Sequence, residues 1–183
     1  MKDAELLGSK EIYKGKIVDL HIETVKLPND QTTEMEIVRH RGAAAVVPID
    51  EDGHVILIRQ YRHATGGYLY EIPAGKLDGN EEPEACAVRE TEEEIGYRPG
   101  NLIPMGWIWT APGFTDEKIY LFLATNLVKT EQNLQDHEVI DVMRIPIENA
   151  TEMALRDEFN DAKTLCGLLR ASHYFGHGSV MGV

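Results

Sequence analysis

The stretch from Gly75 to Tyr97 is unusually rich in carboxylates, with seven glutamates within it. Glu90, Glu93 and Glu94 are spaced i, i+3 and i+4, so on an α-helix their side chains fall within one narrow arc. Like charges at this spacing destabilise a helix by about 0.2–0.5 kcal/mol per pair. Carboxylate oxygens bind hard divalent cations such as Mg²⁺ or Mn²⁺. The spacing therefore indicates a divalent-metal site, and the alternative is a solvated acidic helix whose charges pair with neighbouring arginines.

The same stretch carries start and stop signals for a helix from about Glu82 to Ile95. Pro83 suits the first turn, where its missing N–H would have no partner, and Gly96 suits the left-handed residue that ends a helix. The side opposite the carboxylates is expected to face the core and consists of Ala85, Val88, Thr91 and Ile95. Glu92 lies on that side too and interrupts its apolar character.

The order of patterns along the chain predicts the layers that position this helix. Two strand-like runs up to Val38 flank the turn at 28–31 and predict an N-terminal hairpin or meander. Further strand-like runs follow, and helical spacing appears at 147–158 and 161–175, with Asn149 or Asp161 as a plausible N-cap. This order predicts a mixed sheet with helices packed on it, an α+β or α/β/α layered fold.

The composition narrows the class of function. A length of 183 residues with 43% hydrophobic residues suits a single globular domain. The net charge of −13 argues against nonspecific binding to nucleic acid or anionic membrane. Bound metal ions can reverse the sign of charge locally, so a small anionic substrate is compatible. The absence of long apolar runs and of a signal-peptide pattern, and a count of two cysteines, predict a cytoplasmic protein.

The complete pattern around the glutamates resembles the Nudix hydrolase family. The family's box reads glycine, five residues, Glu, seven residues, Arg-Glu, an apolar residue, any residue, Glu-Glu, any residue, glycine and an apolar residue. Here these positions are Gly75, Glu81, Arg89, Glu90, Thr91, Glu92, Glu93, Glu94, Ile95, Gly96 and Tyr97. The one departure is Thr91, where an aliphatic residue is usual. The resemblance implies an α/β/α sandwich in which the box forms a loop, a helix and a loop.

The resemblance also assigns roles within the box. Glu90, Glu93 and Glu94 would ligate catalytic Mg²⁺ or Mn²⁺, with the Ala74 carbonyl as a further ligand, and Glu93 and Glu94 would take part in catalysis. The structural positions would be Gly75, Glu81, Arg89 and Gly96, with Glu81 and Arg89 as an ion pair that anchors the loop to the helix. The implied reaction is hydrolysis of a nucleoside diphosphate linked to another group, with a divalent ion that polarises the phosphoryl oxygens and activates water.

Features outside the box resemble the ADP-ribose pyrophosphatases of this family. Pro112 stands fifteen residues beyond Tyr97, where these enzymes carry a proline, and is assigned to the substrate site. Likeness in GKIVDLHIETVKLPN and DAKTL extends the resemblance from Ile12 to about Leu169. The implied reaction converts ADP-ribose to AMP and ribose 5-phosphate. The alternatives are a broader nucleoside-diphosphate-sugar hydrolase, for example one acting on GDP-mannose, and a non-catalytic ADP-ribose sensor.

Five more residues are candidates by position. Glu138, in DHEVIDV, matches the acidic-loop residue that supplies a general base or a further metal contact, and the alternative is a solvated loop residue. Arg59 and Arg62 suit the diphosphate, with surface ion pairs as the alternative. Glu71 lies beside the box and could contact metal or substrate. Tyr13 could stack on the base through strands exchanged between protomers, or simply pack on the sheet.

The resemblance also implies a homodimer with a small-molecule nucleotide-sugar partner and neither nucleic acid nor membrane. We expect residues 1–40 to be an N-terminal β region that mediates dimerisation, residues 41–175 to be the Nudix hydrolase domain, and residues 176–183 to be a flexible tail. Trp107 and Trp109 would share one face of a strand, in the core or at the dimer interface. Cys86 would be a small packing residue and not a nucleophile.

Overall fold

A computed structural model describes residues 2–135 and 138–176. Two compact units can be distinguished along the chain. The N-terminal unit comprises Met1–Gly42 and Trp109–Lys118, and the main unit comprises Ala43–Ile108 and Ile119–Val183. Of the expected C-terminal tail, residues 177–183 lie outside the described part. The described part contains no helix that is both long enough and apolar enough to cross a membrane.

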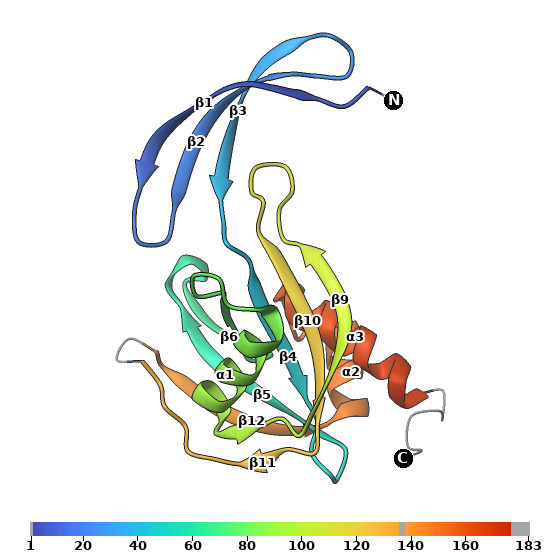
Figure 1. Ribbon diagram of the computed structural model, residues 1–183. Coiled ribbons are helices and arrows are strands. Elements are labelled where there is room, and N and C mark those ends of the chain that lie inside the picture. Colours follow the sequence, from blue (N-terminus) through green and yellow to red (C-terminus); the bar gives the residue numbers. More distant parts are fainter. Residues whose placement is uncertain (1, 136–137, 177–183) are drawn as a thin grey trace. The chain divides into compact units, whose positions relative to one another are not determined.

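The N-terminal unit is a three-stranded antiparallel meander, as the sequence predicts. Its strands are β1 (Glu5–Lys14), β2 (Asp19–Lys26) and β3 (Thr32–Arg39), in that order (Figure 1). The turn between β2 and β3 places Asp30 at φ 64°, a left-handed conformation that Asp tolerates better than most residues. Asp116 ties the segment 109–118 to the end of β3, because its carboxylate accepts hydrogen bonds from Arg39 Nη1 at 2.9 Å and the His40 N–H at 2.6 Å.

The strands of the main unit form one mixed sheet, one antiparallel sheet and one short antiparallel ladder. Four strands follow the order β7-β4-β10-β9, three follow β12-β5-β6, and two follow β11-β8. Their bounds are β4 (Ala43–Pro48), β5 (His54–Arg62), β6 (Gly67–Glu71), β7 (Ala74–Lys76), β8 (Tyr97–Arg98), β9 (Asn101–Trp109), β10 (Lys118–Thr125), β11 (Val128–Lys129) and β12 (Ile140–Pro146), with a 3₁₀ turn η1 (His63–Thr65). β4 pairs parallel with β10 and antiparallel with β7. The sheet is therefore mixed, as the sequence predicts.

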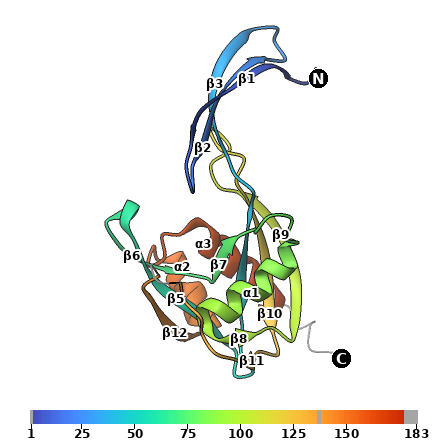
Figure 2. The same ribbon diagram turned by 60° about the vertical axis from the view of Figure 1, so that its left-hand side comes forward.

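The buried strand β4 carries helices on both of its faces. Successive side chains of a strand point to opposite sides, and here Ala44 and Val46 pack in one cluster with Cys86 and Ala87 of helix α1 (Pro83–Ile95). Figures 1 and 2 show α1 on one side of the sheet and the other two helices on the opposite side.

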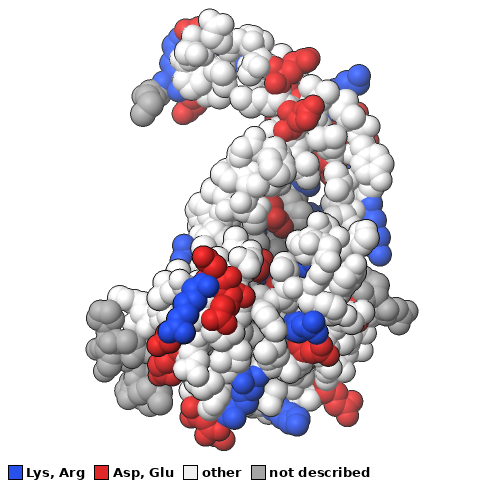
Figure 3. Space-filling view, turned by 180° about the vertical axis from the view of Figure 1, so that it is seen from behind, with Lys and Arg blue, Asp and Glu red and all other residues white. Residues whose placement is uncertain are grey.

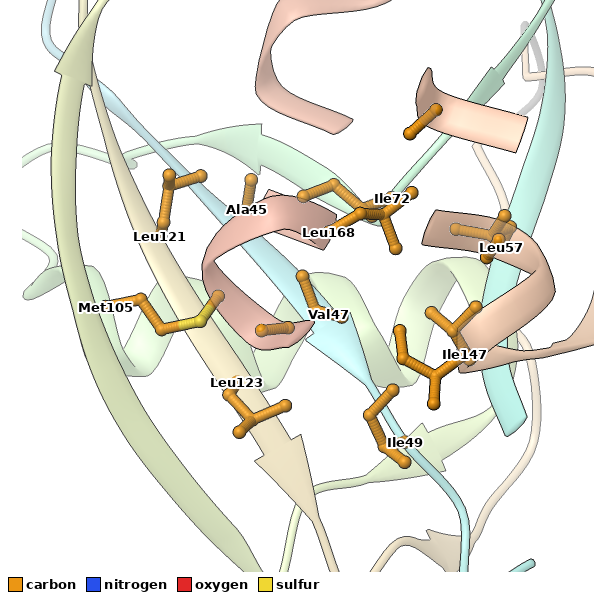
Figure 4. Packing of buried hydrophobic residues seen from close by; sticks show 14 of the residues in the cluster. Ala45, Val47, Ile49, Leu57, Ile72, Met105, Leu121, Leu123, Ile147 and Leu168 are labelled. Carbon is orange, nitrogen blue, oxygen red and sulfur yellow. The ribbon is translucent and has the colours of Figure 1, made fainter. Parts of the chain in front are cut away.

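The opposite face of β4 builds the larger core cluster. Ala45 and Val47 pack there with Leu168 of α3 (Ala162–Gly176) and Ile147 of α2 (Ile147–Leu155), as Figure 4 shows. Helices on both faces of a mixed sheet make the α/β/α sandwich that the sequence predicts.

Two local predictions are wrong. Asn149 does not start a helix, because α2 already begins at Ile147 after Pro146. The buried side of α1 also differs in part from the expected one: Thr91 and Ile95 are buried as expected, but Ala85 is exposed and Val88 is half-buried. The buried residues of α1 are Cys86, Ala87, Glu90, Thr91, Glu94 and Ile95. Two of the carboxylates thus point into the protein, while Ala85 and Val88 line an open hollow together with Arg89, Glu92, Glu93 and Arg98.

Acidic and basic side chains are interspersed on the surface. In Figure 3 the Lys and Arg atoms, in blue, stand mostly beside the red atoms of Asp and Glu. Individual ion pairs agree with this arrangement, for example Arg98 with Glu92 at 3.2 Å and Arg156 with Glu152 at 3.0 Å. Such exposed pairs add little stability, about 0–1 kcal/mol each.

Candidate metal and diphosphate site

Helix α1 supplies the carboxylates, and its two ends are fixed by residues that the sequence marks. Pro83 stands at the first helical position, and Gly96 ends the helix in a left-handed conformation with φ 70°. The Gly96 N–H donates to the Glu92 carbonyl at 3.0 Å. A residue with a side chain would be strained at this φ, so the glycine fixes where the helix ends.

Glu90 and Glu94 are buried side by side on the inner face of α1. Glu90 is 7% exposed and Glu94 is 3% exposed. Burial is the main cause that raises the pKa of Glu94 to about 8, and the charges of Glu90 and Glu138 raise it further. Burial also raises the pKa of Glu90, with contributions from Glu93 and Glu138. Glu90 therefore lies near enough to Glu93, Glu94 and Glu138 for their charges to repel its own.

Arg89 holds the outer part of this cluster together. Its Nε and Nη2 donate to the two oxygens of Glu81 at 3.0 and 2.9 Å, and its Nη1 donates to Glu90 at 2.5 Å and Glu93 at 3.2 Å. The side-chain hydrogen bond from Arg89 is the main cause that lowers the pKa of Glu81 to about 2. The sequence assigns Glu81 and Arg89 to an ion pair, and this pair is present at the start of the helix.

The loop before α1 meets the inner carboxylates through its backbone. The Ala74 N–H donates to Glu94 Oε2 at 2.9 Å. β7 is the edge strand beside β4, and the Pro73 carbonyl accepts from the Val46 N–H at 2.9 Å. Because the backbone groups of neighbouring residues in an antiparallel pair point in opposite directions, the N–H and carbonyl of Ala74 both point away from β4. The Ala74 carbonyl is thus directed to the side on which Glu94 lies.

Glu138 approaches the cluster from the loop before β12. Its N–H donates to the Gln135 carbonyl at 2.9 Å, and its carboxylate accepts from the Gln135 N–H at 2.8 Å. The charge of Glu138 contributes to the raised pKa values of Glu90 and Glu94. The structure therefore brings Glu138 near the α1 carboxylates, although residues 136–137 lie outside the described part.

The two candidate arginines lie on opposite faces of β5, because they are three residues apart. Arg62 donates to Glu71 from Nε at 2.7 Å and from Nη2 at 2.8 Å, in a two-pronged pair. Arg59 pairs with Asp141 at 3.3 Å and lies 4.0 Å from the centre of the Tyr68 ring. The hydrogen bond to Glu71 is the main cause that raises the pKa of Arg62, and the charge of Glu94 adds to it, so Arg62 lies on the side of the carboxylate cluster.

The sequence from residue 38 to residue 168 matches the NUDIX domain family. This chain belongs to the Nudix family. It is 38% identical to an ADP-ribose pyrophosphatase of Bacillus subtilis (strain 168), over 88% of this chain and 89% of that protein. It is 36% identical to a methanol dehydrogenase activator of Bacillus methanolicus, over 89% of each chain. It is 32% identical to a GDP-mannose pyrophosphatase of Yersinia pestis (strain Pestoides F), over 90% of each.

A solved structure supports the fold of this Nudix protein. The crystal structure of an ADP compounds hydrolase superposes with a TM-score of 0.84, covering 98% of both chains at 23% sequence identity. At that identity the likeness establishes the Nudix fold. It agrees with the sandwich that the two faces of β4 build.

The donor set at the Nudix box fits a hard divalent cation. Glu90 and Glu94 are nearly excluded from water, and close carboxylates are costly to charge there unless cations compensate them. Arg89 compensates part of this charge through Glu90 and Glu93, and a bound divalent cation would add to that compensation. Glu93 and the Ala74 carbonyl add oxygen donors, which Mg²⁺ and Mn²⁺ prefer.

Four residues singled out in the sequence lie outside the carboxylate cluster, and a fifth is a packing residue as expected. Tyr13, 59% exposed, and the exposed Pro112 both belong to the N-terminal unit, so their roles toward the substrate stay predictions. Trp107 and Trp109 are 44% and 46% exposed, so their assignment to the core is wrong, whereas a dimer interface stays a prediction. Cys86 is fully buried, and burial raises its thiol pKa to about 12, as expected of a packing residue.

Sequence reasoning missed the charged group that surrounds Glu71. Glu71 is only 1% exposed, and Lys163 contacts it in addition to Arg62. The DAKTL segment, Asp161–Leu165, contains Lys163, but in the sequence it stands out only as a likeness to the family. Lys163 lies 92 residues from Glu71 in the sequence, so local spacing cannot predict the contact.

Proposed function

We propose that this Nudix protein hydrolyses the diphosphate linkage of ADP-ribose, giving AMP and ribose 5-phosphate. The observation that carries the proposal is the buried carboxylate cluster of the Nudix box, with Glu138 and the Ala74 backbone beside it. The likeness to an ADP-ribose pyrophosphatase over most of both chains supports the choice of substrate.

The residues would divide the work according to their positions. Glu90, Glu93, Glu94 and the Ala74 carbonyl would hold Mg²⁺ or Mn²⁺. When bound, the ion supplies positive charge to the phosphoryl oxygens and lowers the pKa of a water molecule. Glu138 would accept the proton of the attacking water, since a carboxylate suits that task once the pKa of the water is lowered.

The arginines would receive the diphosphate. Arg62 is held along one edge of its guanidinium by Glu71, so the other edge can be offered to a phosphoryl oxygen. Arg59 is stacked against Tyr68 and would act further from the carboxylates. Glu71 would then serve the substrate indirectly, by orienting Arg62.

The N-terminal unit would mediate a homodimer. All of β1 is exposed, including Leu6, Leu7, Ile12 and Tyr13, whose exposed fractions range from 44% to 59%. Exposed apolar strands at a sheet edge favour association with another chain. In that dimer Tyr13 and Pro112 would contribute to substrate binding, residues 1–40 would form the dimerisation region and residues 41–175 the Nudix domain. Light scattering after gel filtration tests this, and a monomer at all concentrations would contradict it. The cytoplasmic location stays a prediction.

A second candidate is a hydrolase of wider range that also accepts GDP-mannose. It is favoured by the 32% identity to a GDP-mannose pyrophosphatase. The two candidates share the box and differ in their contacts to base and sugar.

A panel of substrates tests the proposal. Chromatography would follow ADP-ribose, GDP-mannose, UDP-glucose and ATP, each with and without Mg²⁺. The proposal expects AMP to appear from ADP-ribose only when the metal is present, with much slower cleavage of the others. Similar release of AMP and GMP would favour the wider hydrolase. ADP-ribose binding without any product would favour a sensor and contradict the proposal.

A further inference from the structure

Asp161, Lys163 and Thr164 at the start of α3 are polar residues to which the proposed mechanism gives no task, and they surround Glu71. Glu71 is fully buried in the main unit, with an exposed fraction of 1%. Two positively charged side chains hold its carboxylate. Arg62 donates to both oxygens, and Lys163 Nζ donates to Oε2. Lys163 also donates to Asp161 Oδ2 at 3.0 Å, and its side chain is only 11% exposed. A buried carboxylate held in this way is fixed in position, since losing one partner leaves a costly unpaired charge.

Thr164 extends the same group to the backbone before the Nudix box. Its side chain is completely buried, and its hydroxyl donates to Asp161 Oδ2 at 2.6 Å while accepting the Ile72 N–H at 2.9 Å. Asp161 Oδ2 also accepts the Thr164 N–H at 3.0 Å, which caps the first turn of α3. One hydroxyl thus links the helix start to a strand end 92 residues away in the sequence.

These contacts hold the segment Glu71–Ala74 from several sides. The side chain of Glu71 is held by Arg62 and Lys163, the N–H of Ile72 by Thr164, and the carbonyl of Pro73 by Val46. The next residue, Ala74, places its N–H on Glu94. Each residue of the segment therefore has a fixed partner, and the last partner is a carboxylate of the Nudix box.

We propose that Asp161, Lys163 and Thr164 are positioning residues for the metal site. They hold the backbone from Glu71 to Ala74 so that the Ala74 N–H orients Glu94 while the Ala74 carbonyl faces the same site. The inference rests on the proposed function only in taking Glu94 and Ala74 as metal ligands. The segment is short, so a shift of Ile72 is passed on to Ala74 two residues later.

Substituting Thr164 tests the inference, because a single hydroxyl makes the link. Thr164→Val keeps the shape but leaves the buried Ile72 N–H without its partner. Thr164→Ser keeps the hydroxyl. The matched control is Thr151→Val, which removes a hydroxyl that donates to the Ile147 carbonyl at 2.8 Å within α2.

The first readout is Mn²⁺ binding to the metal-free protein, measured by isothermal titration calorimetry. Partners behind metal ligands typically contribute 10–100-fold in affinity, so we expect Thr164→Val to weaken Mn²⁺ binding by about tenfold or more. Thr164→Ser should restore it to within about threefold. Thr151→Val should leave it unchanged.

The second readout is hydrogen exchange in the absence of metal. Thr164→Val should speed exchange of the Ala74 amide, whose own partner is Glu94, while the amide of Val47 in the core of β4 keeps its wild-type rate. A variant with a lower melting temperature but wild-type Mn²⁺ affinity and wild-type Ala74 exchange would overturn the inference, because the contact would then only stabilise the fold.

A second variant, Lys163→Gln, keeps the inference testable if Thr164→Val does not fold. Lys163→Gln removes one of the two cations on Glu71 while keeping a polar side chain, and we expect it to weaken Mn²⁺ binding in the same direction. Unchanged Mn²⁺ affinity in a folded Lys163→Gln protein would also contradict the inference. Both readouts are independent of substrate, so a wild-type protein that binds Mn²⁺ but cleaves no nucleotide sugar would refute the proposed function alone.

Discussion

Gly75 and Glu90 lie so close that residue 75 has no room for a side chain. A Cβ atom placed on Gly75 would stand 1.8 Å from Glu90 Oε1 and 2.0 Å from its carboxyl carbon. A side chain at residue 75 would therefore displace the carboxylate of Glu90, a proposed metal ligand. Its neighbour Ala74 meets the other inner carboxylate, Glu94, through a backbone N–H.

Gly75→Ala should weaken metal binding more than it weakens the fold. The Glu90 carboxylate must move away from the added methyl group, and it can do so because it ends a flexible side chain. We expect Mn²⁺ affinity to fall by about tenfold with a modest drop in melting temperature, measured by calorimetry on the same samples. Gly67→Ala is the control, since a Cβ there meets nothing within 4 Å. Equal Mn²⁺ affinity in both variants would show that Gly75 serves another purpose.

Glu81→Gln should destabilise the protein in a pH-dependent way. The ion pair with Arg89 lowers the pKa of Glu81 from its usual 4.5 to about 2. A lowered pKa adds stability that is full above the unfolded value, near 4.5, and disappears as the pH falls towards 2. Urea unfolding should therefore show a loss of about 1–3 kcal/mol for Glu81→Gln at pH 7, shrinking between pH 5 and pH 2. Glu82→Gln, at the exposed neighbouring residue, is the control and should lose much less stability at pH 7. A pH-independent loss for Glu81→Gln would contradict the ion-pair account.

Glu138→Gln should separate turnover from metal binding. If Glu138 accepts the proton of the attacking water, the side-chain amide of the Gln variant cannot do so. We therefore expect turnover with ADP-ribose to fall by about 10²-fold or more. Mn²⁺ affinity should change little, because the other ligands are untouched. Glu131→Gln, in the same loop and exposed, is the control. Unchanged turnover would remove Glu138 from the mechanism.

Cys86 should resist alkylation in the folded protein. It is fully buried, and burial raises its thiol pKa to about 12 from 9.0, so little reactive thiolate forms at pH 8. Mass spectrometry after iodoacetamide treatment should find residue 86 unlabelled until urea unfolds the chain. The half-buried Cys166 is the internal comparison. Rapid labelling of Cys86 together with loss of activity would contradict its role as a packing residue.

The sequence predicted the parts of the site that follow one another along the chain. Helix α1, its end at Gly96 and the pairing of Glu81 with Arg89 all lie within the box, where spacing determines which side chains meet. It was right that Thr91 and Ile95 of α1 are buried, and wrong about the rest of the buried side. Helical periodicity assigned Ala85 and Val88 to the core, but the protein buries Glu90 and Glu94 there. The periodicity of apolar residues assigns every charged residue to the surface, so it cannot identify a buried carboxylate.

The rest of the site depends on contacts between distant segments. Lys163 and Thr164 reach Glu71 and Ile72 across 92 residues, and only the folding of α3 onto the sheet brings them together. Asp161 could be recognised as a helix cap from its local sequence, but not as a partner of Lys163. Local spacing can locate a motif, whereas the residues that support it come from the tertiary fold.

The central claim is that the buried α1 carboxylates bind the cation on which hydrolysis depends. The most direct measurement compares Glu94→Gln with Glu92→Gln, two isosteric changes on the same helix, because Glu92 lies on the other side and pairs with Arg98. Mn²⁺ affinity and AMP release from ADP-ribose would be measured for both. We predict that Glu94→Gln loses both properties by at least about tenfold while Glu92→Gln retains them. Wild-type Mn²⁺ binding and wild-type AMP release by Glu94→Gln would contradict the account.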